Sequence, residues 1–433
     1  MLSQAKLLPF NTYYLRNLLR LLSDIDWWLA IATSFLVCVG LTTLKYSGQG
    51  SDFYLRQLDF MWAGLFALFV FWRIPYSFWT RKTVVLFIYT VNIGLLLAVM
   101  LWGHAALGAQ RWLSIGPIRL QPSEIAKLVV IFTLSAWLRH RPIRSFWDIL
   151  WVLAIILPPA ILVFKQPDLG TSLTFGAVFL GMSFWAGATF SDILVLVSPA
   201  LSLIAHALNP LLWLGFLIVL AIWLVVFWRR QNWNVFLRIA MTLLIVAANF
   251  GAGEARPHLW GLLKDYQQKR LTSFVNPYED PRGAGYHILQ SLIAIGSGGL
   301  EGAGLGHGNQ SEGAFIPERH TDFIFSVVGE ELGFRISALV IIAYAVICIR
   351  ALIIAFQSRL EPVGSIMAIG LMSMFLFHVF LNIGMTMGIM PVAGVPLPFL
   401  SYGGTALIVD LIAIGLLQSI RNLNPPPRKD VWQ

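Results

Sequence analysis

The sequence predicts an all-α protein that crosses a membrane many times. Of its 433 residues, 58% are hydrophobic and 12% are charged, whereas a soluble protein carries about 25% charged residues. Apolar runs long enough for a membrane-spanning helix recur along the chain. Lipid admits only helices or a closed barrel, because every backbone polar group must be satisfied internally. Uninterrupted runs of this length favour helices, so we expect a helical bundle.

About twelve spans follow from the lengths of these apolar runs. Their predicted ranges are 27–44, 59–73, 83–103, 123–138, 147–164, 170–188, 191–207, 211–228, 235–251, 323–349, 363–388 and 403–420. Short cytoplasmic loops are enriched in Lys and Arg, and the alternate loops and the C-terminal tail carry such residues. They are Arg73, Arg81, Lys82, Arg139, Arg141, Arg144, Arg229, Arg230, Arg350, Arg359, Arg421, Arg428 and Lys429. Both termini are therefore expected on the cytoplasmic side, although the predicted inner loop 187–192 has no basic residue.

The same loops explain the net charge of +9, so we expect no nucleic acid partner. Cys38 and Cys348 both lie inside apolar runs, which argues against a disulfide framework or a cysteine metal site. The histidines of the long polar region (His258, His287, His307 and His320) fit no zinc spacing.

The chain divides into a membrane domain with two tails. Residues 1–26 and 421–433 are expected to be cytoplasmic tails, and 27–420 to form one membrane domain. Its largest extracytoplasmic loop is predicted at about 252–322, and a second outward segment covers 108–127. A third, 390–404, contains three prolines and is expected to re-enter the membrane. Irregular backbone at that depth is tolerated only where it lines a cavity or is buried in protein.

Acidic residues at the start of the tenth predicted span are the first candidates for chemistry. Thr321 is expected to cap that helix, which places Asp322 in its first turn, while Glu330 and Glu331 follow inside the span. Carboxylates at such depth mark functional sites. Alternatively, Asp322 only stabilises the helix start through the helix dipole.

Two further sites have both a structural and a functional interpretation. Glu124 and Lys127 are three residues apart and share a helical face. They form either a structural ion pair or a cation for an anionic substrate with an acid that orients it. Asp168 is expected to cap the helix that follows a tight turn. Asp410, in the middle of the last span, is best interpreted as part of a buried structural pair.

Seven motifs in order resemble the SEDS family (shape, elongation, division and sporulation proteins), and most closely its RodA branch. The resemblance extends from about residue 27 to 420. The motifs are Ala109-Gln-Arg-Trp-Leu113, Gln121-Pro-Ser-Glu-Ile-Ala-Lys127, Gln166-Pro-Asp-Leu-Gly-Thr171, Asn276-Pro-Tyr-Glu-Asp-Pro281, Gly283-Ala-Gly-Tyr-His-Ile-Leu-Gln-Ser291, Pro317-Glu-Arg-His-Thr-Asp-Phe-Ile-Phe325 and Pro396-Leu-Pro-Phe-Leu-Ser-Tyr-Gly-Gly404.

This resemblance implies a SEDS-type bundle and a peptidoglycan glycosyltransferase. Such an enzyme polymerises lipid II during cell elongation and maintenance of cell shape, on the outer face of the bacterial cytoplasmic membrane. Its implied partners are a class B penicillin-binding protein, which is a transpeptidase, and other proteins of the elongation complex. The family's essential aspartate corresponds to Asp322, and its glutamate and lysine near the fourth span correspond to Glu124 and Lys127.

The chain departs from the family pattern in one region. The family usually has ten spans, but residues 189–250 hold three apolar runs where one is usual. We therefore expect an inserted hairpin within about 190–232, which leaves the long loop on the same side. The loop also reads Gly308-Asn-Gln310 where Gly-Thr-Gln is common, which leaves the pyrophosphate contacts there open.

The implied reaction requires a base and groups that stabilise a leaving pyrophosphate. A positioned carboxylate can be the base, and Asp322 is the candidate. Lys127, Arg111 and Arg319, in this order, are candidate pyrophosphate contacts. The candidate substrate-binding set is completed by Glu124, His320, Gln290, Ser291 and Ser401. We assign no metal ligands and expect no organic cofactor, while a divalent cation, Mg²⁺ or Mn²⁺, is left open.

Two other functions fit the same features. Twelve spans with broken helices also suit a lipid II flippase, and the chain could be a non-catalytic scaffold of the elongation complex. Only an enzyme polymerises lipid II in detergent, and a scaffold tolerates loss of Asp322.

Overall fold

The computed structural model describes residues 23–46, 51–106, 109–115, 118–228, 234–255, 284–312 and 318–423, with residues 257, 261, 268, 270, 272–274 and 315. Twelve long helices in this part coincide with the twelve predicted spans. They are α2 (Trp27–Tyr46), α3 (Ser51–Arg73), α5 (Lys82–Trp102), α6 (Pro122–His140), α7 (Phe146–Lys165), α8 (Leu169–Trp185), α9 (Phe190–Leu208), α10 (Pro210–Trp228), α11 (Val235–Glu254), α16 (Ile324–Gln357), α17 (Pro362–Thr386) and α18 (Gly404–Leu423). The short helices α4 (Tyr76–Trp79), α14 (Ala284–Ser297) and α15 (Asn309–Glu312) accompany them.

Ten of these described helices are long and apolar enough to cross a membrane. Of the other two long helices, α8 is apolar but has only 17 residues, and α6 carries three charged residues, Glu124, Lys127 and Arg139. The predicted fold class, an all-α membrane bundle, is confirmed, and the number of long helices agrees with the prediction of about twelve spans. One small sheet was not predicted. Its antiparallel strands β1 (His104–Ala106), β2 (Ala109–Ile115) and β3 (Ile118–Leu120) lie between α5 and α6.

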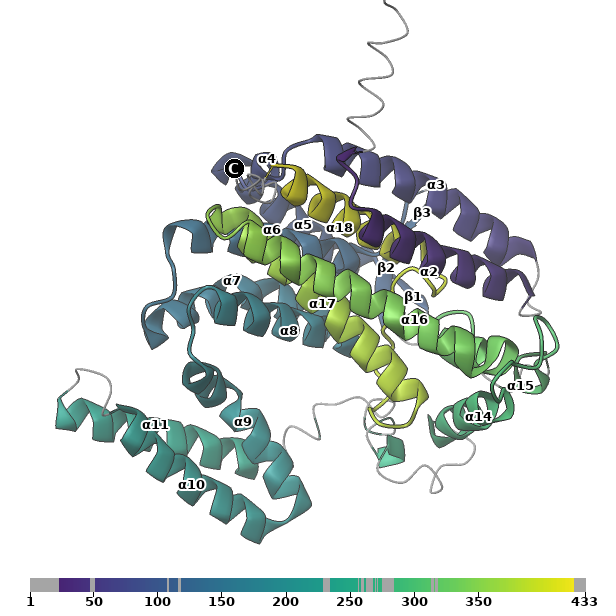
Figure 1. The fold of residues 1–433 in the computed structure, drawn as a ribbon. Helices are drawn as coiled ribbons and strands as arrows, with labels where there is room; N and C mark the ends of the chain where they lie inside the picture. Colours follow the sequence, from purple (N-terminus) through teal and green to yellow (C-terminus); the bar gives the residue numbers. More distant parts are fainter. Residues whose placement is uncertain are drawn as a thin grey trace, which may run out of the picture.

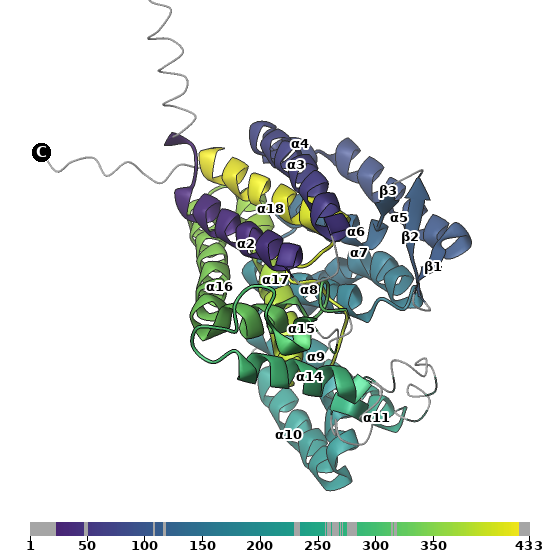
Figure 2. The same cartoon turned by 90° about the vertical axis from the view of Figure 1, so that its right-hand side faces the viewer.

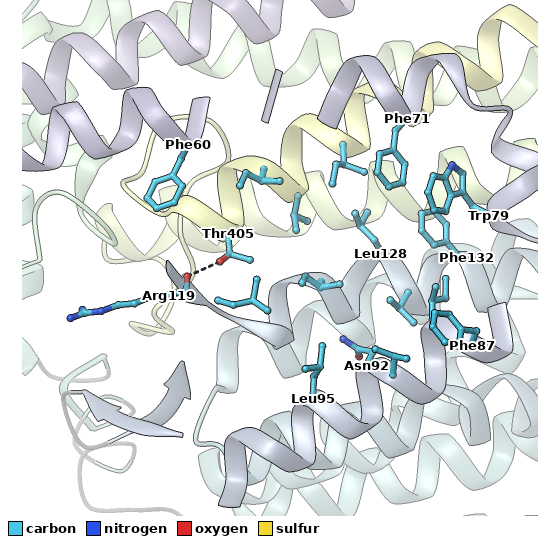
Figure 3. A pocket seen from close by; sticks show the side chains of 18 residues that line it. Phe60, Phe71, Trp79, Phe87, Asn92, Leu95, Arg119, Leu128, Phe132 and Thr405 are labelled. Atoms are coloured by element: carbon cyan, nitrogen blue, oxygen red, sulfur yellow. Dashed lines mark hydrogen bonds between the residues drawn. The ribbon is translucent and has the colours of Figure 1, made fainter. Parts of the chain in front are cut away.

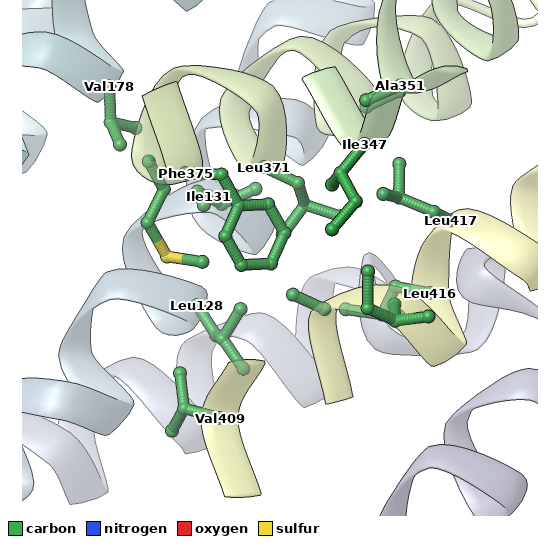
Figure 4. Packing of buried hydrophobic residues seen from close by; sticks show 14 of the residues in the cluster. Leu128, Ile131, Val178, Ile347, Ala351, Leu371, Phe375, Val409, Leu416 and Leu417 are labelled. Atoms are coloured by element: carbon green, nitrogen blue, oxygen red, sulfur yellow. The ribbon is translucent and has the colours of Figure 1, made fainter. Parts of the chain in front are cut away.

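Helices α17 and α18 form the centre of the bundle, since a larger share of each is buried than of any other candidate span. Figure 4 shows apolar side chains of α6, α8, α16, α17 and α18 meeting there, including Leu128, Phe375 and Leu416. A Cβ at Gly370 of α17 would lie 2.8 Å from Met182 Sδ and 3.0 Å from a methyl of Ile131. The glycine thus allows three helices to approach closely, as small residues do in membrane bundles.

Helices α9, α10 and α11 form a separate group beside the bundle, which we call the satellite (Figure 1). Its own apolar cluster contains Val195, Leu220, Leu224, Trp228, Met241 and Ile245. A buried network of neutral groups joins its helices: Asn249 Nδ2 donates to Ser198 Oγ (2.9 Å), and Ser202 Oγ donates to the Asn249 carbonyl (2.7 Å). The predicted inserted hairpin falls within this group, and its absence from the family core stays a prediction.

A buried ion pair fixes the end of the bundle predicted to be cytoplasmic. Asp26 is 1% exposed and accepts hydrogen bonds from the Arg350 guanidinium, while Arg421 Nε lies 3.6 Å from the same carboxylate. The start of α2 therefore lies beside the ends of α16 and α18, as alternating spans require. Arg229 and Arg230, which were part of the topology argument, lie outside the described residues.

Between α17 and α18 the backbone is irregular and returns into the bundle, which agrees with the predicted re-entrant segment. Val392, Val395 and Leu400 are buried there. A Cβ at Gly40 of α2 would lie 2.8 Å from the Leu400 backbone, so this segment packs directly against a helix. Its backbone is enclosed by protein, as irregular structure at this depth requires. We call residues 387–403 the re-entrant segment.

Helix α16 is broken at Gly333, whose φ and ψ are 71° and −174°. The glycine-rich stretch 298–306 fits against the break, where Ala303 N donates to the Glu330 carbonyl (2.9 Å) and Phe334 N to the Gly299 carbonyl (2.9 Å). Residues 334–357 extend about 36 Å at 1.5 Å per residue, enough to cross the hydrocarbon core alone. Glu330 and Glu331 thus precede the part of α16 that can span the membrane by itself.

Candidate active site

Asp322 lies in a turn before α16, and the predicted helix cap at Thr321 is wrong. The helix begins at Ile324 after Phe323, whose side chain has no polar atom to cap it. Thr321 Oγ1 donates instead to the carbonyl and carboxylate of Glu318, both at 3.2 Å. The turn 318–323 is closed by Phe323 N, which donates to the Glu318 carbonyl (3.3 Å). Because Asp322 is outside the first helical turn, stabilising a helix start no longer accounts for it.

Distant parts of the chain hold this turn in place. Ser401 Oγ donates to the Thr321 carbonyl (2.6 Å), and Tyr402 N donates to the His320 carbonyl (2.8 Å). From α17, Asn382 Nδ2 donates to the Asp322 carbonyl (2.9 Å). The re-entrant segment and α17 therefore fix the backbone around Asp322, and Ser401, a predicted substrate contact, already has a structural bond.

The Asp322 side chain is half-buried and lies among charges of both signs. Burial raises its pKa to about 6, while Arg270 and Arg111 lower this pKa and Glu318 and Asp168 raise it. A Cβ at Gly394, where φ is +67°, would lie 3.4 Å from both Arg270 Nη1 and Asp322 Oδ2. The glycine lets the backbone pass beside both groups. A carboxylate that titrates near neutral pH is suited to general base catalysis.

Arg111 and Asp168 meet at the turn between α7 and α8. The Arg111 guanidinium, on β2, donates to the Pro167 carbonyl. Asp168 caps α8 as predicted, accepting from Thr171 N (3.3 Å) and Thr171 Oγ1 (3.0 Å). It also accepts from Ser123 Oγ (3.3 Å) at the start of α6, so it joins α6 and α8.

Lys127 and Glu124 form the ion pair that their spacing predicts, at 2.7 Å, and they are 1% and 2% exposed. Lys127 Nζ also lies 3.3 Å from His378 Nε2, which is 3.1 Å from Thr174 Oγ1. We call these four residues the Lys127 cluster. The structural interpretation of the pair is thus realised in this structure, and a direct substrate contact of Lys127 stays a prediction.

Asp410, near the Lys127 cluster, acquires a local role. Its carboxyl group accepts a hydrogen bond from the backbone of Phe399. Phe399 has a φ of +66°, a left-handed conformation that costs free energy in a residue with a side chain. Tyr344 Oη donates to the adjacent Pro398 carbonyl. Asp410 and Tyr344 therefore support the turn that leads to Ser401.

The remaining predicted contacts lie around this centre rather than in it. Arg319 is buried and faces Glu331 and Glu330, whose charges oppose the lowering of its pKa by burial. The His320 ring stacks on Phe53 with centroids 4.6 Å apart, and burial lowers its pKa. Gln290 is half-buried on α14, which lies against α16 at this end of the bundle (Figure 2).

Ser291, also on α14, is fully buried, and its hydroxyl donates to the Thr386 carbonyl (2.6 Å) and pairs with Ser326 Oγ. It therefore connects α14 with α16 and α17. Three residues of this region were missed by sequence reasoning as site residues: Arg270, His378 and Asn382. A polar His or Asn inside a span is itself the signal that could have selected the last two.

An apolar groove of about 340 Å³ runs beside this region, between α3, α5, α6 and α18. Figure 3 shows Phe60, Phe71, Phe87 and Phe132 around it, with Arg119 of β3 at one end and Trp79 at the other. The Arg119 carbonyl accepts from Thr405 Oγ1 at 3.4 Å. The groove therefore starts at the small sheet and extends along the membrane-spanning helices.

Comparison with known proteins matches this architecture to one family. The sequence model described as a cell cycle protein, FtsW/RodA/SpoVE, matches residues 23–213 and 207–424. The chain belongs to the FtsW/RodA/SpoVE family. The two matched stretches overlap at the connection between α9 and α10, within the satellite.

Relatives in the FtsW/RodA/SpoVE family align over most of their length. The peptidoglycan glycosyltransferase MrdB of Escherichia coli K12 is 37% identical over 397 residues, covering 90% of this chain and 92% of MrdB. The peptidoglycan glycosyltransferase RodA of Treponema pallidum is 33% identical, covering 93% of this chain and 98% of RodA. Stage V sporulation protein E of Bacillus subtilis is 32% identical, covering 91% and 96%.

Solved structures of the family share the fold. A chain from a peptidoglycan synthase complex that coordinates polymerization and crosslinking has a TM-score of 0.69 and 26% identity, covering 92% of this chain and 98% of that chain. RodA of Thermus thermophilus has a TM-score of 0.60 and 23% identity, with coverage of 92% and 97%. The bundle around Asp322 is thus the fold of this family.

Proposed function

We propose that this chain polymerises lipid II, with Asp322 as the general base. It is a peptidoglycan glycosyltransferase, as its family and its similarity to MrdB and RodA indicate. The observation that carries the mechanism is the half-buried Asp322 carboxylate, which has a pKa of about 6 and is influenced by the charges of Arg270 and Arg111. It combines a base with cations next to it, which is what transfer from a pyrophosphate donor needs.

The reaction proceeds by one inverting displacement. Asp322 accepts the proton of the acceptor sugar hydroxyl while that oxygen forms a bond to the anomeric carbon of the donor. The bond between this carbon and the pyrophosphate oxygen breaks, and its electron pair leaves with undecaprenyl pyrophosphate. An α-linked donor gives a β-linked glycan, and the proton on Asp322 is afterwards lost to water.

The leaving pyrophosphate is stabilised first by Arg111 and Arg270. Both guanidinium groups lower the pKa of Asp322 through their charge, so both act electrostatically on the proposed base. Lys127 and Arg319 are deeply buried and face their own acids. This arrangement favours Arg111 over Lys127 for direct contact, and it gives the Lys127 cluster a supporting role.

The polyprenyl chain of one substrate lies in the groove between α3, α5, α6 and α18. The groove is lined almost entirely by apolar side chains, which match a hydrocarbon chain that stays in contact with lipid. Arg119 at its sheet end (Figure 3) provides a cation near the expected position of the phosphate groups.

A divalent cation, Mg²⁺ or Mn²⁺, does not fit a site made by the protein alone. Among the described residues, three or more His, Cys, Asp or Glu side chains do not gather at one point, and the Asp322 environment contains two arginines. We therefore derive no step through a metal and leave its requirement to a titration with chelator.

The proposed partner is a class B penicillin-binding protein, because a structural neighbour belongs to a synthase complex that coordinates polymerization and crosslinking. Other elongation proteins join this complex. Ten apolar spans place the chain in a membrane, which we propose to be the bacterial cytoplasmic membrane, with Asp322 on its outer side.

The decisive experiment uses purified protein with its transpeptidase partner and lipid II in detergent, where there are no sides to cross. Glycan polymer on a gel, absent with Asp322→Asn of equal thermal stability, supports the enzyme. Polymer at wild-type rates from that variant would overturn the base assignment. Activity confined to transport across sealed vesicles would favour a flippase.

A further inference from the structure

We infer that Asn382 is a positioning residue that fixes the backbone on both sides of the Asp322 carboxylate. This inference rests on the proposed role of Asp322 as the base. Asn382 lies on α17 and is 0% exposed. Its Nδ2 donates to the Asp322 carbonyl at 2.9 Å and to the Val395 carbonyl at 2.7 Å. Both hydrogens of one amide are therefore used on two segments that are distant in sequence.

These two segments lie next to the carboxylate. Val395 follows Gly394, where a Cβ would lie 3.4 Å from Asp322 Oδ2 and equally far from Arg270 Nη1. Arg270 Nη1 in turn lies 3.5 Å from the Val392 carbonyl that it faces. By holding Val395 and Asp322 to one point on α17, Asn382 sets how the base and the nearest cation lie relative to each other.

The helix that carries Asn382 is held by polar contacts on both sides of this residue. His378 precedes it by four residues and contacts Lys127, while the Thr386 carbonyl follows by four and accepts from Ser291 Oγ. Residues four apart share one face of a helix. The three residues thus form a polar stripe on α17 that connects the Lys127 cluster, the Asp322 turn and α14.

The hydrogen bonds that the Asn382 side chain donates, rather than any that it accepts, account for an amide at this position. Within the described residues, Asn382 Oδ1 has no hydrogen-bond partner although it is buried. A buried unpaired acceptor costs stability, so an apolar side chain would serve better if packing were its only purpose. The two N–H groups have defined partners, and both partners flank the site.

The satellite provides a matched control in Asn249. It is also 0% exposed, its Nδ2 donates to Ser198 Oγ (2.9 Å) and to the Ile245 carbonyl (2.8 Å), and its Oδ1 is unpaired among the described residues. Asn382→Ala and Asn249→Ala therefore remove the same side chain with the same number of bonds, in two regions that differ in their relation to Asp322.

The test measures kcat, KM and Tm of the full-length variants with the transpeptidase partner and lipid II. We expect Asn382→Ala to lower kcat roughly 10–100-fold, the size of effect that small misplacement of a reacting group has, with KM changed less than threefold. Asn249→Ala should lower Tm to a similar extent and keep kcat within about twofold of wild type. Asn382→Leu copies the branched shape without the donors and should not restore kcat.

The pH profile provides a readout that general destabilisation would not move. Loosening the turn admits water to Asp322, which lowers its pKa towards the ordinary value of 3.8 while Arg270, Arg111, Glu318 and Asp168 still face it. The acid limb of kcat should therefore shift to lower pH in Asn382→Ala and stay in place in Asn249→Ala.

Three outcomes would overturn the inference: equal loss of kcat in both alanine variants, recovery of kcat in Asn382→Leu, or an unchanged acid limb in Asn382→Ala. If Asn382→Ala does not fold, Asn382→Ser, which keeps one donor, is measured with Asn249→Ser by the same criteria. Asp322→Asn is assayed in parallel. Activity of that variant would defeat the proposed function, whereas an inactive Asp322→Asn beside a fully active Asn382→Ala would defeat only this inference.

Discussion

The satellite and the central bundle are both packed helix groups, but they differ in the polar side chains between their helices. Both are helix groups with an apolar cluster and a buried Asn that bridges segments. In the satellite the described hydrogen bonds around Asn249 join neutral groups, namely the side chains of Ser198, Ser202 and Trp213 and the Ile245 carbonyl. Around Asn382 the centre adds charges: Lys127 and Glu124 form a buried pair, and Asp322 lies half-buried beside Arg270.

This difference distinguishes polar side chains that hold helices together from charged side chains that have a functional role. The described side-chain bonds that join the three satellite helices are neutral, whereas in the centre Lys127 of α6 contacts His378 of α17. The charges around Asp322 occur where the backbone is irregular, at the re-entrant segment and at the turn before α16. Ionised groups in such surroundings are costly and mark functional sites. The comparison predicts large effects of substitutions at the centre and small effects in the satellite.

The largest effect is expected for Asp322→Asn. Asn keeps the size of the side chain but removes the base, so kcat should fall about 10²–10⁴-fold. Ionising a buried carboxyl whose pKa is raised opposes folding above the ordinary pKa, so the variant should be at least as stable at pH 7. Polymerisation kinetics with thermal melting check this. A stable Asp322→Asn variant with near-normal turnover would contradict the assignment of Asp322 as the base.

Lys127→Ala should come next, because it leaves Glu124 buried without its partner. Breaking a buried pair costs about 3–5 kcal/mol, and activity should fall strongly. Replacing both residues, as Glu124→Leu with Lys127→Leu, should recover much of the Tm. If the double variant also recovers turnover, the pair is structural. If Tm returns and turnover does not, the charge itself serves the reaction, and Lys127→Arg then tests shape at constant charge.

The pH dependence gives an effect of intermediate size. The base must be ionised, and the pKa of Asp322 is about 6, so kcat should rise with pH through 6 and level off near 7. Below pH 5 it should fall about tenfold per pH unit. Initial rates between pH 4.5 and 8, with stability followed over the same range, provide the measurement. A flat profile in a protein that remains folded would contradict titration of Asp322.

The smallest effect is expected from deleting two spans of the satellite. Removal of residues 190–228, which comprise α9 and α10, should leave polymerase activity within a few-fold of wild type. Asn249→Leu accompanies the deletion, because α11 would otherwise expose this amide to lipid. Activity is compared at equal amounts of folded protein. Complete loss of turnover in a folded deletion variant would show that the satellite shapes the site.

The fold was largely predictable, because apolar run length and basic loops directly reflect the bilayer. Run length placed all twelve long helices, and the proline-rich stretch 390–404 correctly indicated irregular backbone. The small sheet was missed, since its strands are only three to seven residues long and are paired by a chain reversal rather than by a strong local pattern. The helix start near Asp322 was also misplaced, because the turn is held by Tyr402 and by Ser401, which is 80 residues from its partner Thr321.

The site was predictable in part. The spacing of Glu124 and Lys127 gave their ion pair, and the turn chemistry gave the Asp168 cap. The sequence could not show that His378 contacts Lys127, because the two residues are 251 positions apart. It also could not show that Arg270 lies close to Asp322, which is 52 positions away. Both contacts depend on how α17 and the re-entrant segment pack, and local sequence patterns carry no information about this packing.

The break in α16 has a consequence for how this sequence can vary. A Cβ at Gly298 would lie 2.0 Å from the Gly329 carbonyl oxygen, one at Gly302 would lie 2.2 Å from the Glu331 carbonyl oxygen, and one at Gly333 would lie 2.3 Å from the Gly302 backbone nitrogen. Each glycine thus faces backbone, which cannot rotate away as a side chain can. A substitution at any of the three cannot be compensated by a change of side chain opposite. We therefore expect single amino-acid substitutions at these three positions to disrupt the structure. A change there would require the loop and the helix to change together.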